Sequence, residues 1–483
     1  MVDGDAAKRP APHAAASPGA PAPVDSSQPY SQTANPTRDD LILWDIAHVW
    51  HAFTQMQEYE PLLFEQAHGC TLVDIDGREY LDGTSSLWCN VHGHRHPKID
   101  AAIRAQLDLV AHTTSLGASN STTIRLARRL VELTPVGLNH VFFSGDGSSS
   151  VEVALKMALQ YWQQRQDPRP RKTRYVALAD AYHGDTIGSV SLGGVARFHA
   201  MFRPLLFDVI RVPAPEVYRA PADAPPDRLA EYYLAAVERV LAEQHEEIAA
   251  LVVEPMVQAA AGMLVHPPGY LRGLRELTRR YDVLLIADEV AVGCGRTGRM
   301  FACEHEDVSP DFLCLGKGIT GGYLPLAATL TTTAVWQAFL GTAGEQKQFF
   351  HGHTYGGNPL AAAAALASLA VFDEEETLAR MQPKIARMQE HLARIANHPN
   401  VGDVRQCGLI GAIELVRDRA TKEAPPWEEQ RGAKACKLAR KEGVMVRPLG
   451  NIVVVMPPLA ITLAELDRIL VAVEHGIDGA FRE

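Results

Sequence analysis

The sequence of 483 residues lacks a basic excess, and it lacks an apolar run long enough to cross a membrane. Lys and Arg number 46 against 57 Asp and Glu, which gives a net charge of −11. This balance disfavours binding to nucleic acids or anionic membranes, because their phosphates attract basic surfaces. Since no run reaches about 18 consecutive apolar residues, we expect no transmembrane helix. The N-terminus also lacks the apolar segment of a secretory signal peptide.

Cysteine is scarce, and its pattern excludes two kinds of structure. The 7 cysteines are odd in number, lie far apart and form no CxxC pair. Disulfide frameworks and structural zinc sites need paired or closely spaced cysteines, so we expect neither. Together with the missing signal peptide, this pattern predicts a cytoplasmic protein.

Large apolar residues are nearly absent from residues 1–40, which are rich in Ala, Pro and Ser. Such a segment buries too little surface to offset its conformational entropy, so we predict a disordered N-terminal tail. A transit peptide is the alternative, but Asp3, Asp5 and Asp25 and the few arginines disfavour it. We expect ordered structure to begin near Leu41.

After the tail, short apolar runs alternate with amphipathic helical patterns. The runs are short and continuous, which is typical of strands buried on both faces. In the helical segment 270–280, Leu271, Leu274 and Leu277 share one face. This alternation predicts an α/β fold whose mostly parallel central sheet is covered on both sides. The predicted strands are residues 140–143, 174–180, 250–255, 283–288 and 312–316.

The same pattern divides the ordered chain into three parts. Residues 91–360 carry the strand–helix alternation and form the predicted large domain. From about Ala361 an Ala/Leu-rich helix and then mixed helix and strand patterns follow, which predicts a smaller α+β domain at residues 361–483. We expect residues 41–90 to join this smaller domain.

Chemically useful residues follow the predicted strands at the points where the strands end. In open parallel sheets, ligands bind beyond the carboxyl ends of the strands. Asp288 ends one such run, Lys317 directly follows another and Tyr182 lies two residues past a third, while a small-residue loop with Gly147 and Ser148 follows a fourth. We therefore expect a carboxylate, an amine, an aromatic ring and this loop to share one edge of the sheet.

The loop at Gly147 and Ser148 opens a predicted helix over residues 151–162. Backbone N–H groups at a helix start, together with the helix dipole, favour a phosphate. The spacing fits neither a Walker A loop nor GxGxxG, which disfavours nucleoside triphosphates and dinucleotides. An ordinary N-capped helix is the alternative for this loop taken alone.

Each of the other three residues also has an alternative interpretation. Asp288 could pair with Arg296 or Arg299, Lys317 could be a solvated loop lysine, and Tyr182 could fill the strand end. Taken together they match pyridoxal 5′-phosphate, which needs a phosphate site, a ring stacker, a carboxylate for its pyridine nitrogen and an amine for its aldehyde. The sequence therefore predicts this cofactor.

Three histidines, His92, His94 and His96, alternate in a glycine-containing turn. Such spacing does not place three imidazoles on one face of a regular helix, and the predicted chemistry needs no metal. We interpret this segment as a polar loop and predict no metal site.

Two segments resemble the signature of class-III (ω-type) aminotransferases. They are IADEVAVGCGRTG at residues 286–298 and LGKGITGGYLP at residues 315–325. The resemblance runs from about residue 41 to the end. It implies a fold-type I pyridoxal-phosphate enzyme that forms a homodimer with shared active sites and acts on small-molecule substrates, with ping-pong kinetics through pyridoxamine phosphate.

The resemblance also implies roles for individual residues. Lys317, Asp288 and Tyr182 would be catalytic and would bind the cofactor, Tyr182 also contacting substrate. Cofactor phosphate would be bound by Gly147 and Ser148, and across the dimer by His353 and Thr354. Substrate would be contacted by Gly352 and by Arg447, whose guanidinium would bind a carboxylate.

Further segments resemble the branch of the family that makes 7,8-diaminopelargonate from 7-keto-8-aminopelargonate in biotin biosynthesis. They are WHAFTQM (50–56), DGTSSLWCNVHGH (82–94), ALKMALQYW (154–162), YHGDT (182–186), HGHTYGGNP (351–359) and VRPLG (446–450).

Three positions in these segments bear on the amino donor. Users of S-adenosylmethionine have Tyr where this chain has Phe53, and a Trp–Trp pair where it has Leu87 and Trp88. All three residues are expected to contact substrate. This departure resembles the bacillus-type branch, which is associated with L-lysine as donor, so the donor stays open between the two.

Other functions remain alternatives at this stage. One is an ω-aminotransferase that acts on a diamine, β-alanine or an ornithine-type substrate. A second is a mutase or decarboxylase on the same fold, and a third is a catalytically silent binding protein. The presence of both Lys317 and Asp288 argues against the third.

Overall fold

The computed structural model describes residues 35–482, which form two compact units. The first unit contains the described residues up to Glu65, together with Asp74–Gly77. Its helix α1 (Arg38–His48) begins at Arg38 rather than near Leu41. Thr37 caps this helix, because its backbone N–H donates to Asp40 Oδ2 at 2.9 Å and its Oγ1 accepts from the Asp40 N–H at 3.2 Å. The predicted tail otherwise lies outside the described residues.

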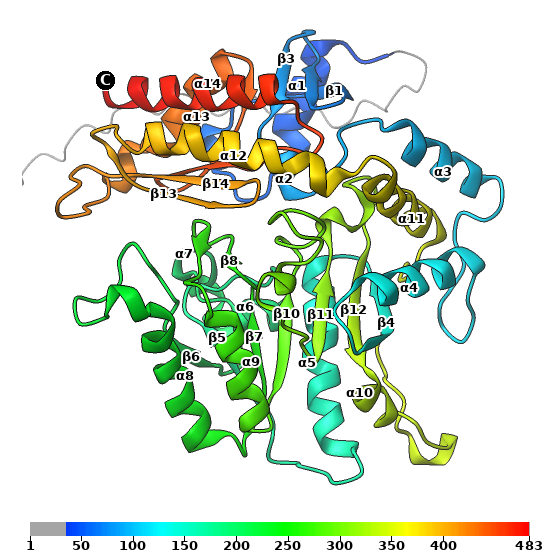
Figure 1. Cartoon of the computed structure of the whole chain (residues 1–483). Helices are drawn as coiled ribbons and strands as arrows, with labels where there is room; N and C mark the ends of the chain where they lie inside the picture. Colours follow the sequence, from blue (N-terminus) through cyan, green and yellow to red (C-terminus); the bar gives the residue numbers. More distant parts are fainter. Residues whose placement is uncertain (1–34, 483) are drawn as a thin grey trace, which may run out of the picture. The chain divides into compact units, whose positions relative to one another are not determined.

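The second unit contains a seven-stranded sheet with the strand order β4-β12-β11-β10-β7-β5-β6 (Figure 1). Neighbouring strands from β11 to β6 pair in parallel, whereas β12 runs antiparallel to both of its neighbours. The predicted mostly parallel central sheet is therefore confirmed. The strands are β4 (Leu138–Ser144), β5 (Arg174–Leu178), β6 (Ile210–Val212), β7 (Ile248–Val253), β10 (Leu284–Asp288), β11 (Phe312–Leu315) and β12 (Ala327–Thr332).

Helices cover both faces of this sheet, which explains why its central strands β7, β10 and β11 are apolar at every position except Asp288. In β10, Leu284 and Ile286 pack in the cluster that contains helix α5, whereas Leu285 and Ala287 pack in the cluster that contains α8 and α9. The predicted stripe of Leu271, Leu274 and Leu277 is buried. The helices of this region are α3 (Pro97–Leu107), α4 (Ser121–Leu133), α5 (Gly147–Gln164), α6 (Ile187–Leu192), α7 (Ala196–His199), α8 (Leu229–Gln244), α9 (Tyr270–Arg280), α10 (Thr333–Gln337) and α11 (Pro359–Glu374).

The C-terminal part forms an antiparallel sheet with the order β13-β14-β17-β16. Another sheet, β1-β2-β3-β15, pairs β3 with β15 in parallel, so the chain near residue 80 shares a sheet with the chain near residue 444. The predicted domain boundaries near 41, 91 and 361 stay a prediction. The elements are β1 (Phe64–His68), β2 (Thr71–Asp74), β3 (Glu79–Asp82), β8 (Val257–Gln258), β9 (Leu264–Val265), α12 (Thr377–Ile395), β13 (Val401–Cys407), β14 (Ile410–Leu415), α13 (Arg431–Lys441), β15 (Val444–Met445), β16 (Arg447–Leu449), β17 (Ile452–Val455) and α14 (Leu463–Arg482).

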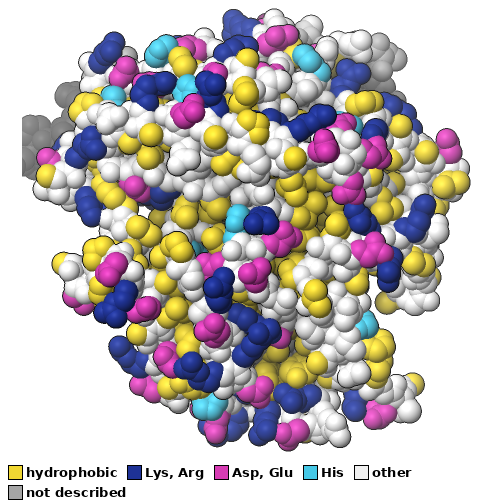
Figure 2. Space-filling model, viewed as in Figure 1, with side chains coloured by type: hydrophobic (Ala, Val, Ile, Leu, Met, Phe, Trp, Pro, Cys, Tyr) yellow, Lys and Arg dark blue, Asp and Glu magenta, His cyan; other side chains and the backbone are white. Residues whose placement is uncertain are grey.

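The distribution of surface charge and the hydropathy of the helices both bear on the partners expected from the sequence. Figure 2 shows basic and acidic side chains interspersed on the visible face, without a broad field of one sign. Over residues 35–482, no helix is both long and apolar enough to span a membrane.

Candidate active site

Lys317 lies just past the carboxyl end of β11, at the start of a short 3-10 helix (Lys317–Thr320). Its φ of 39° is unfavourable for a residue with a side chain, and such backbone strain often occurs at active sites. Burial lowers the pKa of its amine, an effect that the negative charge of Asp288 opposes. Within residues 35–482 the amine has no hydrogen-bond partner and lies 5.4 Å from the centre of the Trp88 ring. It is thus available to react with a ligand.

Asp288 is the last residue of β10, the strand beside β11, and is buried. Its Oδ2 lies 2.7 Å from Nδ1 of His183, and its Oδ1 accepts a hydrogen bond from the Val290 N–H at 3.0 Å. The alternative pairing with Arg296 is wrong, because that guanidinium donates to oxygens elsewhere. A buried carboxylate whose orientation is held by two partners suits a ligand that carries a positive charge.

Tyr182 follows β5 at the same edge of the sheet, and its hydroxyl donates to Asp185 Oδ2 at 2.8 Å. Its backbone N–H donates to Glu254 Oε1 at 3.2 Å. Burial raises the pKa of Glu254 to about 7, and the charge of Asp288 adds to this rise. The sequence analysis did not identify His183 or Glu254 as site residues. Both follow strands at the predicted edge of the sheet, and this position in the sequence could have identified them as site residues.

The loop predicted to bind phosphate is the first turn of α5, which begins at Gly147. Asp146 caps the helix through a 2.8 Å bond from the Ser149 N–H, and Ser148 Oγ lies 2.8 Å from Thr186 Oγ1. A Cβ atom at Gly147 would collide with Val290, so only glycine lets the backbone pack this closely against the residue that follows Asp288 and Glu289. The free N–H groups of this turn therefore lie next to the end of β10.

The turn Ser85–Trp88 is left-handed over its whole length. Its φ values are 50°, 49°, 82° and 68°, and none of the four residues is glycine. Each such residue costs roughly 1–2 kcal/mol in this conformation. Trp88 extends from this turn to Lys317, whereas Leu87 is half exposed. Sequence analysis could not detect this strain, because glycine usually marks positive φ and the turn contains none.

Four of the other predicted residues lie elsewhere in the second unit. Gly352, His353 and Thr354 lie on an exposed loop, where a side chain at 352 would meet open space. Arg447 is exposed in β16 and pairs with Val454. Within this unit the structure therefore brings together Lys317, Trp88, Asp288, Tyr182, Gly147 and Ser148 along one sheet edge, but not these four. Phe53 belongs to the first unit and is 67% exposed.

The three alternating histidines each have a different partner. His92 Nε2 lies 3.1 Å from Ser368 Oγ, His94 Nε2 lies 3.1 Å from Asp82 Oδ2, and His96 Nε2 lies 3.1 Å from Glu375 Oε1. Over residues 35–482, no group of three or more His, Cys, Asp and Glu residues could hold a metal ion.

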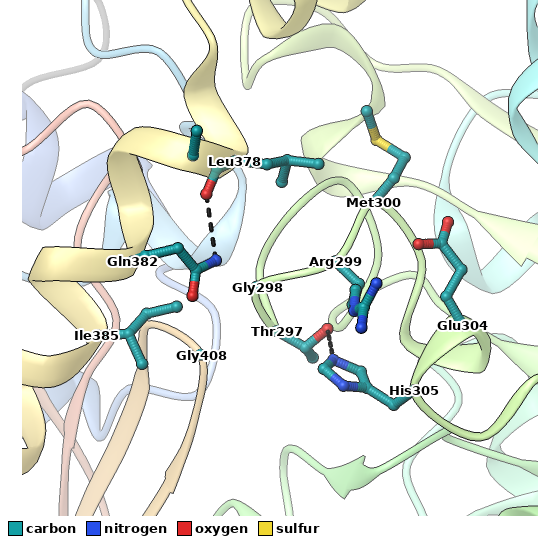
Figure 3. A pocket seen from close by; sticks show the side chains of 11 residues that line it. Thr297, Gly298, Arg299, Met300, Glu304, His305, Leu378, Gln382, Ile385 and Gly408 are labelled. Atoms are coloured by element: carbon teal, nitrogen blue, oxygen red, sulfur yellow. Dashed lines mark hydrogen bonds between the residues drawn. The ribbon is translucent and has the colours of Figure 1, made fainter.

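A cavity of about 630 Å³ lies away from these residues, between α12 and the loop that contains Gly298 (Figure 3). Gln382 and Ile385 line one side, whereas Arg299 and His305 line the other. His305 Nε2 lies 3.0 Å from Thr297 Oγ1, so one ring nitrogen is already engaged. Neither Lys317 nor Asp288 lines this cavity, and we assign no chemistry to it.

Comparison with known proteins gives a consistent picture. Residues 54–477 match the family model described as Aminotransferase class-III. Two relatives named adenosylmethionine-8-amino-7-oxononanoate aminotransferase come from Nitratidesulfovibrio vulgaris and Geobacter sulfurreducens. The first is 54% identical over 90% of this chain and 82% of its own, and the second is 50% identical over 90% of this chain and 96% of its own.

Solved structures agree with these relatives. An enzyme of the same name from Methanocaldococcus jannaschii is 40% identical with a TM-score of 0.87, covering 92% of this chain and 100% of its own. An omega transaminase from Pseudomonas jessenii in complex with PMP is 30% identical with a TM-score of 0.86, covering 91% of this chain and 97% of its own.

Proposed function

This chain belongs to the class-III aminotransferases, and we propose that it aminates 7-keto-8-aminopelargonate (8-amino-7-oxononanoate) in biotin biosynthesis. The donor loses its amino group and gains a carbonyl, while the C7 ketone of the acceptor becomes the amine of 7,8-diaminopelargonate. The observation that carries the aminotransferase chemistry is the amine of Lys317, which lies beside Trp88 and just past the end of the strand next to that of Asp288. The names of relatives that match nine-tenths of the chain support this acceptor.

Class-III aminotransferases use pyridoxal 5′-phosphate, and the residues at the sheet edge fit this group. Lys317 provides an amine without a hydrogen-bond partner among residues 35–482, Asp288 a buried carboxylate, and α5 a helix start that only glycine permits. When bound, the cofactor supplies an aldehyde that takes up the amino group and a ring that withdraws electrons from the donor carbon.

The residues of the chain do the rest of the chemistry. Lys317 would hold the cofactor aldehyde through its amine, and the same amine would act as the general base that moves a proton from the donor carbon. Its lowered pKa favours the neutral amine that this step needs. Asp288 would keep the pyridine nitrogen protonated, and Tyr182 would pack against the ring. Gly147 and Ser148 would bind the phosphate through backbone N–H groups.

We also place the enzyme in the cytoplasm as a homodimer with shared active sites. The cysteines of the described chain are all free, which suits a reducing compartment. Large apolar side chains near the loop with His353 and Thr354 are exposed, namely Leu116, Phe350 and Tyr355. Exposed apolar groups of this kind favour burial against a second chain, which would bring His353 and Thr354 to the phosphate of the partner.

A direct assay tests the acceptor. Purified protein is incubated with 7-keto-8-aminopelargonate and either S-adenosylmethionine or L-lysine, and the appearance of 7,8-diaminopelargonate is measured by mass spectrometry. The proposal expects product with one of the two donors. The second candidate, an omega transaminase for other amines, is supported by the likeness to the Pseudomonas jessenii enzyme. Turnover of simple amines and ketones without this product would favour it.

A further inference from the structure

The left-handed turn Ser85–Trp88 is unfavourable by itself and must be stabilised by contacts with residues outside the turn. Four consecutive residues with side chains adopt positive φ there, which isolated chains avoid. Strain of this kind persists only where the surrounding structure enforces it, and it is often part of how a site works. Because Trp88 extends from the turn to Lys317, whatever holds the turn also sets the space beside the reactive amine.

Asp82 holds the turn from one side. This carboxylate is fully buried, and its Oδ1 accepts hydrogen bonds from the Ser86 N–H at 2.9 Å and the Thr84 N–H at 3.3 Å. Its Oδ2 accepts from Ser86 Oγ at 2.8 Å and lies 3.1 Å from His94 Nε2. Burial alone would raise the pKa of Asp82, but the bonds from His94 and Ser86 outweigh burial and leave the pKa below its ordinary value. The group therefore stays charged.

Arg296 holds the turn from the other side. Its buried guanidinium donates to Ser85 Oγ at 3.2 Å and to the Asn90 carbonyl at 3.2 Å. A third bond, at 2.5 Å, joins it to the Pro457 carbonyl. Ser85 Oγ in turn donates to the Met456 carbonyl at 2.6 Å. The guanidinium therefore links Ser85, at the start of the turn, and Asn90, just past its end, to Pro457 in the C-terminal segment.

We propose that Asp82, His94 and Arg296 are positioning residues that select the amino donor by fixing the turn that carries Leu87 and Trp88. The proposal rests on the proposed function, because it takes Lys317 as the reacting amine. A rigid turn admits a donor whose shape fits the space beside Trp88 and excludes a bulkier one. A loosened turn discriminates less between amines of different bulk.

The test uses the holoenzyme and the first half-reaction alone, so it needs no acceptor. Rates at which L-lysine, S-adenosylmethionine and 7,8-diaminopelargonate bleach the yellow enzyme are measured for each variant. Ser86→Gly removes one bond to Asp82 and relieves strain, and His94→Ala removes another. We expect the ratio of rates between the preferred and the least preferred amine to fall about tenfold in both, because small misplacements in an active site have effects of this size or larger.

Two control variants separate positioning from general damage. His94→Gln keeps an N–H donor for Asp82 and should keep the donor ratio of the unaltered enzyme. His391 makes a similar 2.8 Å bond to Asp467 far from the turn in sequence, so His391→Ala should also leave the ratio unchanged. If all amines slow equally in Ser86→Gly and His94→Ala, or if no ratio moves, the inference is wrong.

Failure of this inference can be distinguished from failure of the proposed function. An enzyme that is bleached by amines but never aminates 7-keto-8-aminopelargonate disproves the proposed acceptor, while the donor ratios still decide the role of the turn. An enzyme that no amine bleaches disproves both. Should His94→Ala fail to fold, Ser86→Gly decides the question, because glycine adopts positive φ without strain.

Discussion

His183 Nδ1 lies 2.7 Å from Asp288 Oδ2, and both side chains are buried. Asp288 ends β10 and His183 follows β5, with β7 between these strands, so the pair bridges the sheet edge. The bond fixes the rotamer of the carboxylate that we propose to hold the positive charge of the cofactor ring.

Loss of this bond should slow the chemistry. His183→Phe keeps an aromatic ring but removes the hydrogen bond to a charged group, which contributes roughly 1.5–3 kcal/mol. We therefore expect kcat to fall about 10- to 100-fold. Steady-state kinetics measure this effect, with His391→Phe as the control for loss of a similar histidine–carboxylate bond. A normal kcat in the His183 variant would contradict a role for the pair.

Replacement of Lys317 should abolish both colour and turnover. Lys317→Ala removes the attachment and a general base, and positioned bases contribute roughly 10²–10⁴-fold. We expect the rate to fall by at least about 100-fold. Lys172→Met is the matched control, because this buried lysine donates its hydrogen bonds to backbone carbonyls, those of His245, Ile248 and Asp282, away from the predicted site. A Lys317→Ala enzyme that stays yellow after dialysis and still transaminates would overturn the assignment.

Glu254 should make stability fall as the pH rises. Burial raises the pKa of its carboxyl to about 7 in the folded chain, against an ordinary value of 4.5. Between these values the folded chain binds a proton that the unfolded chain has lost. The contribution, up to about 3 kcal/mol, is therefore full below pH 4.5 and is lost as the pH rises to about 7.

Urea unfolding at several pH values measures this effect. Glu254→Gln stays neutral throughout, so the free energy of unfolding should depend less steeply on pH between 4.5 and 7. Glu390→Gln alters an exposed carboxylate and should leave the slope unchanged. Identical slopes in the Glu254 variant and the unaltered protein would show that Glu254 ionises normally.

Replacement of Arg447 should weaken binding of the acceptor without disturbing the attachment of the cofactor to Lys317. If its guanidinium binds the carboxylate of the acceptor, Arg447→Ala removes charge-assisted bonds that contribute roughly 1.5–3 kcal/mol. We expect KM for 7-keto-8-aminopelargonate to rise about 10- to 100-fold with the yellow colour intact. Arg468, also exposed, provides the control substitution Arg468→Ala. An unchanged KM would remove Arg447 from the substrate site.

The shared active site predicts complementation between two inactive chains. In a mixed dimer of Lys317→Ala and Thr354→Ala chains, one of the two sites contains an intact Lys317 and an intact Thr354. Co-expression should therefore restore activity that neither chain has by itself, and sedimentation should give the mass of a dimer. Mixed dimers without restored activity would place Thr354 outside the partner's site.

The sequence predicted the sheet and the edge that positions the candidate site, because buried parallel strands leave continuous apolar runs and end at a common edge. Asp288, Lys317 and Tyr182 each end or closely follow such a run, so their shared location could be expected without knowledge of strand order. The pairing of His183 with Asp288 could not, because it depends on β5 and β10 lying two strands apart.

The strained turn was beyond sequence reasoning for another reason. Ser85, Ser86, Leu87 and Trp88 contain no glycine that would indicate positive φ. Asp82 and His94 are close to the turn in sequence, but Arg296 and the Met456 carbonyl, which bind Ser85, are distant along the chain. Tertiary contacts, rather than local preference, determine this conformation.

Reduction with borohydride tests the central claim most directly. The reagent makes the link between a lysine amine and the cofactor aldehyde permanent, and peptide mass spectrometry then locates the modified lysine. Our account predicts a phosphopyridoxyl group on the peptide that contains Lys317. Modification of Lys156 or Lys172 instead, or of no lysine in a yellow and active enzyme, would contradict it.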